Sequence, residues 1–335
     1  MQLNDPVIRS KPAALIASMA CFIAVSFSPV VAVSSGESSE ASQEIIDINT
    51  QHSREPIQPI PDNKTFNSGK VALGEKLFKD RRLDSNQRRA CADCHNLEIG
   101  GTDKLAFSLN SAGKATRFNT PTIFNVSLNS QYYWSGKFLT LEDQISDALK
   151  ELNTTWPQLV YTVNAIPEYA DRFNALYADG VTEQNIRDAF IHFERSLLTP
   201  NSAFDRFLKG EPAALGRNQL QGYKLFKSYG CITCHQGKNI GGNFVLNMNK
   251  MGAPFGNLNS TRERLQGKLQ QIRVPSLRNV ALTAPYFHDG SATTLYQAVQ
   301  RMIDEYLGMN IAEEDIYYIV SFLNSLTGEY KGKKL

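Results

Sequence analysis

The sequence predicts a mainly α-helical protein that contains two tandem copies of one small unit. Three observations support this fold class. The pattern C-x-x-C-H occurs twice, at residues 91–95 and 231–235. Apolar residues recur every three or four positions through most of the chain, which is the spacing of one helix face. Segments around the first C-x-x-C-H pattern also recur, in the same order, around the second.

The N-terminal part is predicted to be an export signal followed by a linker. Arg9 and Lys11 precede an uncharged, mostly apolar run, so residues 1–33 are interpreted as a signal peptide. The run is also long enough to span a bilayer, and an uncleaved N-terminal anchor is the alternative. Residues 34–65 are rich in Ser, Glu, Gln and Pro and are expected to form a flexible linker.

Helical periodicity predicts most of the remaining chain. The first helix begins near Asn67, and a long polar loop at 98–120 follows the first C-x-x-C-H pattern. Another helix begins at Thr294, and a linking segment with two prolines and a glycine lies at 199–215. Apolar spacing predicts further helices at about 140–152, 157–163, 167–178, 182–198 and 312–326.

The second half repeats the first. GEKLFK at 74–79 recurs as GYKLFK at 222–227. PTIFNVSLNSQYYWSG at 121–136 aligns without a gap with PSLRNVALTAPYFHDG at 275–290. We therefore predict an internal duplication, with an N-terminal domain at 66–205 and a C-terminal domain at 206–335.

C-x-x-C-H is the attachment pattern of haem c, in which two thiols bind the porphyrin and the histidine binds the iron. The predicted attachment residues of two haems are Cys91, Cys94, His95, Cys231, Cys234 and His235. A zinc ribbon would bring its cysteine pairs much closer together, and a thioredoxin-type pair needs a βαβ context. Because haem c is attached outside the bacterial cytoplasm, we expect a periplasmic protein. The net charge of +2 gives no indication of nucleic-acid binding.

The two units differ at one position that matters for iron ligation. Met302 follows the second motif on a predicted helix, and methionine is the usual partner of histidine in electron-transfer haems. It could instead fill a gap in the core, and Met248, Met251 and Met309 are competing ligands. The repeat aligns Met302 with Ala148, whose methyl group cannot bind iron. We expect a saturated second iron and an open first iron.

Two further residues are candidates for the chemistry of an open iron. Glu151 lies about one helical turn beyond Ala148, where its carboxylate would serve as an acid–base group toward peroxide. A solvated glutamate near a helix end is the alternative. Trp134 aligns with His288 and is an aromatic candidate for the path between the haems, or a core tryptophan.

The sequence resembles the bacterial di-haem cytochrome c peroxidases, within the wider family that includes MauG, the enzyme that matures tryptophan tryptophylquinone. The resemblance runs from about Gly69 to Gly328. It rests on ALGEKLF, CADCHN, NTPT, YYWSGK, PEYADRF, LLTPNSAFDRFLKG, CITCHQG, LRNVALTAPYFHDG and FLNSLTG. The resemblance implies two cytochrome c-like domains. The N-terminal haem would be the peroxidatic site, and the C-terminal haem would be the high-potential site where electrons enter.

The resemblance also implies roles for individual residues. Met302 matches the family's axial ligand, Glu151 its catalytic glutamate and Trp134 its inter-haem tryptophan, while Arg273 matches a basic residue near the haem edge. A calcium ion between the domains would be bound by the residues that match its ligands, Asn119, Thr283 and Pro285.

The chain departs from many family members in the loop after the first motif. Those members carry a histidine there, which caps the peroxidatic iron until reduction, whereas residues 98–120 contain none and Ser111 stands at about that place. We therefore expect no reductive uncapping by this loop.

The leading hypothesis is reduction of hydrogen peroxide with electrons from a small c-type cytochrome or cupredoxin. One alternative is a MauG-like oxidase acting on a protein or organic substrate. The resemblance weighs against it, because that maturase has tyrosine in place of Met302, although Tyr296 and Tyr306 are close in sequence. The other alternative is a di-haem electron carrier without turnover. For the oligomeric state, a homodimer is one of the open alternatives.

Overall fold

The computed structural model describes residues 55–62, 64–247 and 271–335, and these residues are mainly helical, as predicted. The predicted signal or anchor at 1–33 lies outside them, as do Met248 and Met251. Among the described residues, none of the helices combines the length and the apolar character needed to cross a membrane.

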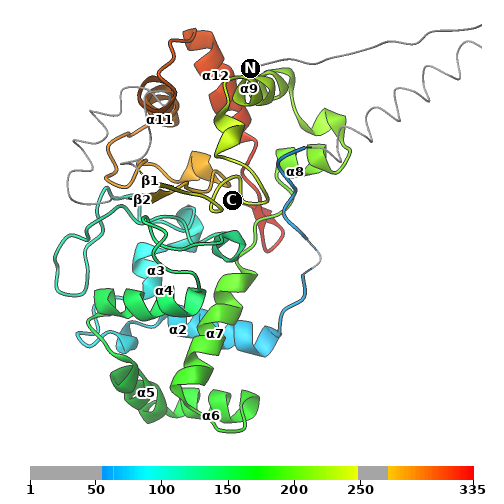
Figure 1. The fold of residues 1–335 in the computed structure, drawn as a ribbon. Helices are drawn as coiled ribbons and strands as arrows, with labels where there is room; N and C mark the ends of the chain where they lie inside the picture. Colours follow the sequence, from blue (N-terminus) through cyan, green and yellow to red (C-terminus); the bar gives the residue numbers. More distant parts are fainter. Residues whose placement is uncertain (1–54, 63, 248–270) are drawn as a thin grey trace, which may run out of the picture. The chain divides into compact units, whose positions relative to one another are not determined.

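The helices agree with the predicted ones to within a few residues (Figure 1). The α-helices are α2 (Ser68–Lys79), α3 (Cys91–Cys94), α4 (Leu141–Ala148), α5 (Trp156–Ala165), α6 (Pro167–Leu176), α7 (Glu183–Ser196), α8 (Ala203–Leu208), α9 (Arg217–Ser228), α11 (Leu295–Arg301) and α12 (Glu313–Asn324). Six 3-10 turns are η1 (Arg81–Leu83), η2 (Leu97–Ile99), η3 (Val126–Leu128), η4 (Leu149–Leu152), η5 (Pro212–Ala214) and η6 (Cys231–Thr233), and another is η8 (Val280–Leu282).

The strands are short and form two small antiparallel pairs. Strand β1 (Val245–Asn247) pairs with β2 (Gln271–Arg273), and β3 (Glu329–Tyr330) pairs with β4 (Lys333–Lys334). The register places Val245 opposite Arg273. The chain has no larger sheet among its described residues, so helix packing forms the two large apolar cores.

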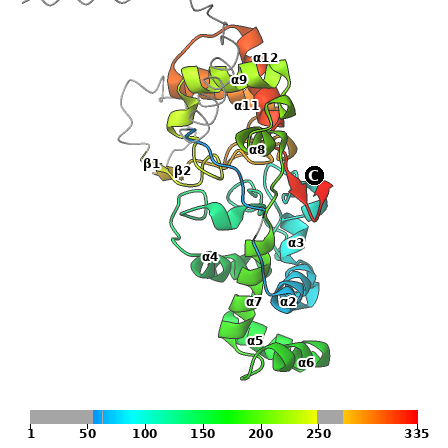
Figure 2. The same cartoon turned by 90° about the vertical axis from the view of Figure 1, so that its right-hand side faces the viewer.

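Each core is built around a close crossing of two helices. In the first half α2 packs on α7, and a Cβ atom on Gly74 would lie only 2.1 Å from the carbonyl oxygen of Ala189. In the second half α9 packs on α12, and a Cβ atom on Gly222 would lie 1.8 Å from the carbonyl oxygen of Tyr318. Glycine is required at both crossings because the backbones touch. Figures 1 and 2 show these two helix pairs.

Residues 55–62 are not the solvated linker that their composition predicts. Ile57 and Ile60 are 1% and 0% exposed, and Ile57 belongs to the apolar core of the second half. The Ile60 amide donates to Asp205 Oδ1 at 3.0 Å, and Arg278 donates to the Gln58 carbonyl at 2.9 Å. We call residues 55–62 the N-terminal strap. Burial of two isoleucines and satisfied backbone groups outweigh its polar, proline-rich composition.

The C-terminal end of the chain packs on the first half. Tyr330 packs against the first core, with its ring centroid 5.1 Å from that of Phe124. Lys331 pairs with Glu75 of α2 at 3.1 Å. The start of the described chain therefore packs on the second half, and the hairpin β3–β4 packs on the first.

Helix α8 lies at the predicted boundary between the two domains. The predicted boundary between 205 and 206 falls inside α8. Phe204 of this helix packs in the second core, with ring centroids 4.7 Å from Tyr223 and 5.0 Å from Phe322. The whole of α8 thus packs with the residues that follow it.

Two helices change their hydrogen-bonding pattern near predicted site residues. The helix expected at 140–152 is α-helical to Ala148 and continues as the 3-10 turn η4, which ends at Asn153 with φ 48°. After α11 the chain continues as a π-helical segment, η9 (Met302–Leu307). π-Helical turns are rare and occur often at functional sites.

Candidate functional site

The first C-x-x-C-H pattern forms α3 and the residue that follows it. The Nδ1 atom of His95 lies 3.3 Å from the carbonyl oxygen of Gly101, which orients the ring and leaves Nε2 for another partner. Gly101 has φ 73°, and a Cβ atom there would lie 2.8 Å from Thr122 Oγ1. Burial lowers the pKa of His95, which favours the neutral imidazole that binds metals.

The second pattern forms η6 and the two residues that follow it, and its cysteines and histidine are half-buried. Burial lowers the pKa of His235 to about 4, so its imidazole is neutral at physiological pH. Burial raises the pKa of Cys231 to about 11. The Nδ1 atom of His235 is buried without a hydrogen-bond partner among the described residues.

A cavity of about 360 Å³ lies beside the second pattern. Predicted site residues that are distant in the sequence lie together on its wall. Its lining includes Cys231, Cys234, His235, Met302, Trp134, Arg273, Asn119, Thr283 and Pro285. The cavity thus brings together the second attachment pattern, the predicted axial methionine and the three predicted calcium residues. Glu151 and the first pattern do not line it.

Met302 is the first residue of the π-helical segment η9 and lines the cavity with His235. Of the competing methionines, Met309 is 39% exposed and does not line the cavity. Within the described residues, the structure therefore favours Met302 over Met309 as a group that reaches the cavity.

Arg273 is a buried cation at the cavity wall. Its Nε donates to the Tyr133 carbonyl at 3.1 Å, and its amide donates to the Trp134 carbonyl at 2.7 Å. Its Nη1 is buried and has no partner among the described residues. Burial lowers the pKa of Arg273 to about 10, so the side chain still carries its charge at neutral pH. A buried guanidinium nitrogen with no partner is costly unless an anion binds it.

These residues fit a covalently attached haem. Two thiols, a neutral imidazole and a thioether share one cavity, and the Nη1 atom of Arg273 would pair with a carboxylate of the porphyrin. The cavity thus offers soft ligand atoms, sulfur and imidazole nitrogen, and one positive charge at its edge. A haem requires both.

Trp134 is buried and lines the same cavity. Its Nε1 donates to the Asn119 carbonyl at 2.8 Å, and its ring lies 6.3 Å from that of His288, between centroids. The indole is therefore held rigidly between the halves.

The predicted calcium residues are close to one another but make other contacts. Asn119 receives a hydrogen bond from Trp134 on its carbonyl, and its amide donates to the His288 carbonyl at 2.8 Å. Thr283 Oγ1 donates to the Val280 carbonyl at 3.1 Å. No cluster of three or more His, Cys, Asp or Glu side chains in the described part of the chain suits a metal ion. A calcium ion here would depend on amide, hydroxyl and carbonyl oxygens.

Glu151 lies on η4, in the first half, with an exposed side chain. Desolvation raises the pKa of Glu151, the Asp147 carboxylate adds to the rise, and a hydrogen bond from Asn110 opposes it. The main-chain carbonyl of Glu151 accepts from the Ser111 amide at 2.9 Å. The loop after the first motif therefore touches Glu151 directly.

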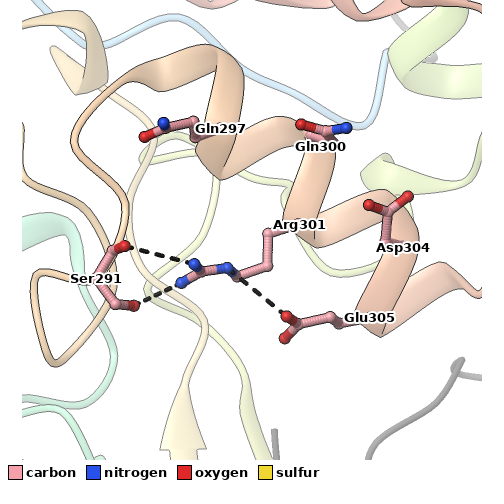
Figure 3. A pocket seen from close by; sticks show the side chains of 6 residues that line it. All are labelled: Ser291, Gln297, Gln300, Arg301, Asp304 and Glu305. Carbon is pink, nitrogen blue, oxygen red and sulfur yellow. Dashed lines mark hydrogen bonds and ion pairs between the residues drawn. The ribbon is translucent and has the colours of Figure 1, made fainter. Parts of the chain in front are cut away.

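A polar pocket of about 380 Å³ lies beside α11 and η9 (Figure 3). At its centre Arg301 donates to Ser291 Oγ at 2.5 Å and pairs with Glu305 at 3.6 Å. The guanidinium also lies 5.0 Å from the ring centroid of Phe287, which lines the cavity. Arg301 thus joins the turn at 287–291 to the segment that begins with Met302.

The sequence reasoning missed Glu194 on α7. The residue is 6% exposed, its Oε2 has no hydrogen-bond partner in the described chain, and burial raises the pKa of Glu194 to about 8. A signal was present, because Glu194 falls on the apolar face of the helix predicted at 182–198. It also missed the buried pair Asp84 and Ser111, for which no local pattern exists.

Comparisons with known proteins show the family of the chain. A family model described as di-haem cytochrome c peroxidase matches residues 68–213. The cytochrome c peroxidase Ccp of Escherichia coli (strain K12) is 38% identical over 85% of this chain, which spans 63% of the length of that protein. The cytochrome c551 peroxidase of Nitrosomonas europaea is 37% identical over 84% of this chain and 86% of that protein.

A solved structure is also similar. The crystal structure of a MauG-like protein associated with microbial copper homeostasis has a TM-score of 0.66 and 25% identity, and the match covers 82% of this chain and 93% of that one. The family implies haem c as the cofactor. The chain belongs to the di-haem cytochrome c peroxidase family, which is a family of oxidoreductases.

Proposed function

We propose that the protein reduces hydrogen peroxide to water with electrons from a small periplasmic c-type cytochrome or cupredoxin. One observation carries this proposal. The thioether of Met302 shares a cavity with His235, whereas the aligned residue of the first half is Ala148, which has no donor atom. One centre would then be saturated for electron transfer and the other open to peroxide. The names of the relatives, which are cytochrome c peroxidases, support the same reaction.

The two haems, when bound, supply the redox chemistry of peroxide reduction. In the proposed C-terminal domain at 206–335, His235 and Met302 would hold the electron-entry haem, and Arg273 would bind its carboxylate edge. In the proposed N-terminal domain at 66–205, His95 would hold the peroxidatic haem. The indole of Trp134, fixed by its hydrogen bond to Asn119, supports a role on the electron path between them.

Glu151 is proposed as the acid–base group of the open centre. Its carboxylate accepts a proton from hydrogen peroxide and returns it to the oxygen that leaves as water. Desolvation and Asp147 raise the pKa of Glu151, which makes its conjugate acid easier to form near neutral pH. The Asn110 hydrogen bond keeps the ionised form available to act as the base.

We also propose that the two domains arose by internal duplication. Asn125 and Asn279, which align in the repeat, both have φ 60°. Both side chains donate to the same hydroxyl, Thr199 Oγ1, at 2.7 and 2.9 Å. Tyr133 and the aligned Phe287 also share positive φ angles of 71° and 69°. Positive φ is uncommon for such residues, so its recurrence at aligned positions supports a common origin.

Export to the periplasm and a calcium ion bound by Asn119, Thr283 and Pro285 are parts of the same proposal. Haem c attachment supports export. The three residues line one cavity, which supports a shared oxygen site.

A MauG-like oxidase is the second candidate, and one observation favours it. Tyr306 lines the cavity together with Met302, so a phenol is available near the second centre. Spectra of the oxidised protein distinguish the candidates, because methionine ligation and tyrosine ligation of haem give different signatures.

The experiment is steady-state peroxide consumption with reduced cytochrome c or a cupredoxin as donor. Glu151→Gln should lower turnover by at least about a hundredfold, as expected for loss of a general acid–base group. Glu211→Gln is the control, because Glu211 is exposed and only loosely paired with Arg206, at 3.8 Å. Full activity of Glu151→Gln would exclude the proposed acid–base role.

A further inference from the structure

A buried carboxylate anchors the loop that follows the first motif. Asp84 and Ser111 are each 1% exposed. Asp84 Oδ1 accepts from Ser111 Oγ at 2.6 Å, and Oδ2 accepts from the amides of Arg88 and Arg89 at 2.8 and 3.0 Å. Asn86 adds a hydrogen bond to Ser111 Oγ at 2.8 Å. Because every partner of Asp84 is a donor, the carboxylate holds the Ser111 hydroxyl in one direction.

Ser111 lies at the tip of a hairpin-like turn. The Thr116 amide donates to the Ser108 carbonyl at 2.8 Å, and the Asn110 amide donates to the Lys114 carbonyl at 2.9 Å. The side chain of Asn110 accepts from the Lys114 amide at 3.0 Å and stiffens the same turn. The tip is therefore ordered internally as well as anchored to Asp84.

The same tip holds Glu151 at two points. The Ser111 amide donates to the Glu151 main-chain carbonyl at 2.9 Å. The Asn110 side chain lies beside the Glu151 carboxylate and acts to lower its pKa. The Ser85 amide donates to the Leu152 carbonyl at 3.3 Å, so residues beside Asp84 also contact η4. The backbone of Glu151 is thus tied to this loop, and its carboxylate lies beside Asn110 of the same loop.

We propose that Asp84, Ser111 and Asn110 form a positioning device that holds the Glu151 carboxylate ready for proton transfer. The device rests on the acid–base role proposed above for Glu151. None of the three residues needs to touch peroxide, because each acts through Glu151. The buried Asp84–Ser111 contact fixes the loop, and the loop in turn fixes the carboxylate.

The charges around Glu151 define the expected pH effect. Asp147 faces it and raises its pKa, Lys150 is paired with Asp147, and Tyr133 lies within electrostatic range. Loss of the Asn110 hydrogen bond leaves the Asp147 repulsion and the desolvation unopposed. The acid limb of the pH profile of kcat/KM should then move to higher pH.

Ser111→Ala and Asn110→Asp in the holoprotein test the device. Hydrogen–deuterium exchange of residues 108–116 is measured together with the pH profile of peroxide turnover. Ser111→Ala should speed exchange of the loop amides by about tenfold and move the acid limb up by about half to one pH unit. Asn110→Asp keeps the acceptor for the Lys114 amide and places a second carboxylate against Glu151, so it should move the limb at least as far. Ser228→Ala, on an exposed surface of the second half, is the control.

Each of the other results would contradict a different part of the proposal. Unchanged exchange in Ser111→Ala would mean that Asp84 does not hold the loop. Faster exchange with an unchanged acid limb in both variants would mean that the loop is structural and does not position Glu151. If Glu151→Gln retains full activity, the acid–base role has failed instead, and the exchange of the loop amides still decides whether the anchor exists.

Discussion

Met302 and Ala148 are the two residues that separate the proposed roles of the halves. The repeat aligns them, and the structure places Met302 on the wall of the cavity that His235 also lines. Motif recognition alone found the two attachment patterns, because they are local. The place of Met302 on a helix of the second unit and the family resemblance predicted it as the partner of His235, and the structure adds that both residues line one cavity.

Replacement of Met302 tests the ligand assignment. Met302→Ala should remove the sulfur ligand, lower the reduction potential of the second haem and slow turnover with a small donor protein by about tenfold or more. A redox titration followed by absorbance measures the potential. Met309→Ala is the matched control, because Met309 is exposed and lies outside the cavity. Equal potentials in the wild type and Met302→Ala would rule out this ligand.

Glu194 predicts a pH dependence of stability. Burial raises the pKa of Glu194 from 4.5 to about 8, so the folded protein keeps a proton that the unfolded chain has lost. Its contribution to stability is fully present below pH 4.5 and is lost as the pH rises through about 8. The effect is on the order of several kcal/mol.

Denaturant unfolding at pH 5 and pH 8 measures this effect. Glu194→Gln should lose less free energy of unfolding between the two pH values than the wild type, because its side chain does not titrate. Glu183→Gln, at the exposed start of α7, is the control. The same pH slope in the wild type and Glu194→Gln would show that this carboxyl titrates normally.

At the scale of elements, amphipathic helices were predictable and their irregular ends were not. The helix predicted at 182–198 is found as α7, because its apolar stripe is long and regular. The π-helical segment at Met302 was not predictable from apolar spacing; it follows Arg301, which contacts Ser291 and Glu305 (Figure 3). Packing that involves distant residues decides such details.

The N-terminal strap shows the same limit. Its proline-rich, polar composition predicts a linker, and composition alone cannot show that Ile57 and Ile60 find a buried surface. The polar loop at 98–120 is a similar case. Its sequence predicted only a long polar loop, yet the Ser111 hydroxyl is buried against Asp84.

The lack of a histidine at 98–120 predicts that the oxidised protein is active without prior reduction. It contains no histidine, and Ser111 is fixed on Asp84, so this loop offers no side chain of that kind to cap the first iron. The oxidised protein as purified should consume peroxide without a lag when donor and peroxide are added together. A sample reduced beforehand should show the same initial rate within about twofold. A pronounced lag that prior reduction abolishes would contradict this expectation.

At the scale of the whole molecule, the N-terminal strap depends on one buried ion pair. Arg278 and Asp205 lie 2.8 Å apart and are 1% and 0% exposed. Arg278 also donates to the Gln58 carbonyl, and Asp205 accepts from the Ile60 amide. The pair therefore joins three separate stretches of chain: the strap, α8 and the segment before η8.

Asp205→Asn should lower the free energy of unfolding by about 3–5 kcal/mol, because it leaves the Arg278 charge buried without its partner. Chemical denaturation measures this loss. Arg206→Gln, which removes the exposed pair with Glu211, should change stability by less than about 1 kcal/mol. Limited proteolysis of Asp205→Asn should also release the strap first. A loss no larger than that of the control would contradict a structural role for the pair.

The two ends of the described chain each pack on the half to which they do not belong. Residues 55–62 complete the second core, and β3–β4 cover part of the first. Neither half is therefore a self-sufficient piece of polypeptide. A fragment cut at the junction would lack either the isoleucines that seal it or the tyrosine that covers it. Cleavage of one peptide bond at that junction would leave two fragments that still bind each other through these end segments. Both predicted haem sites would therefore be retained or lost together.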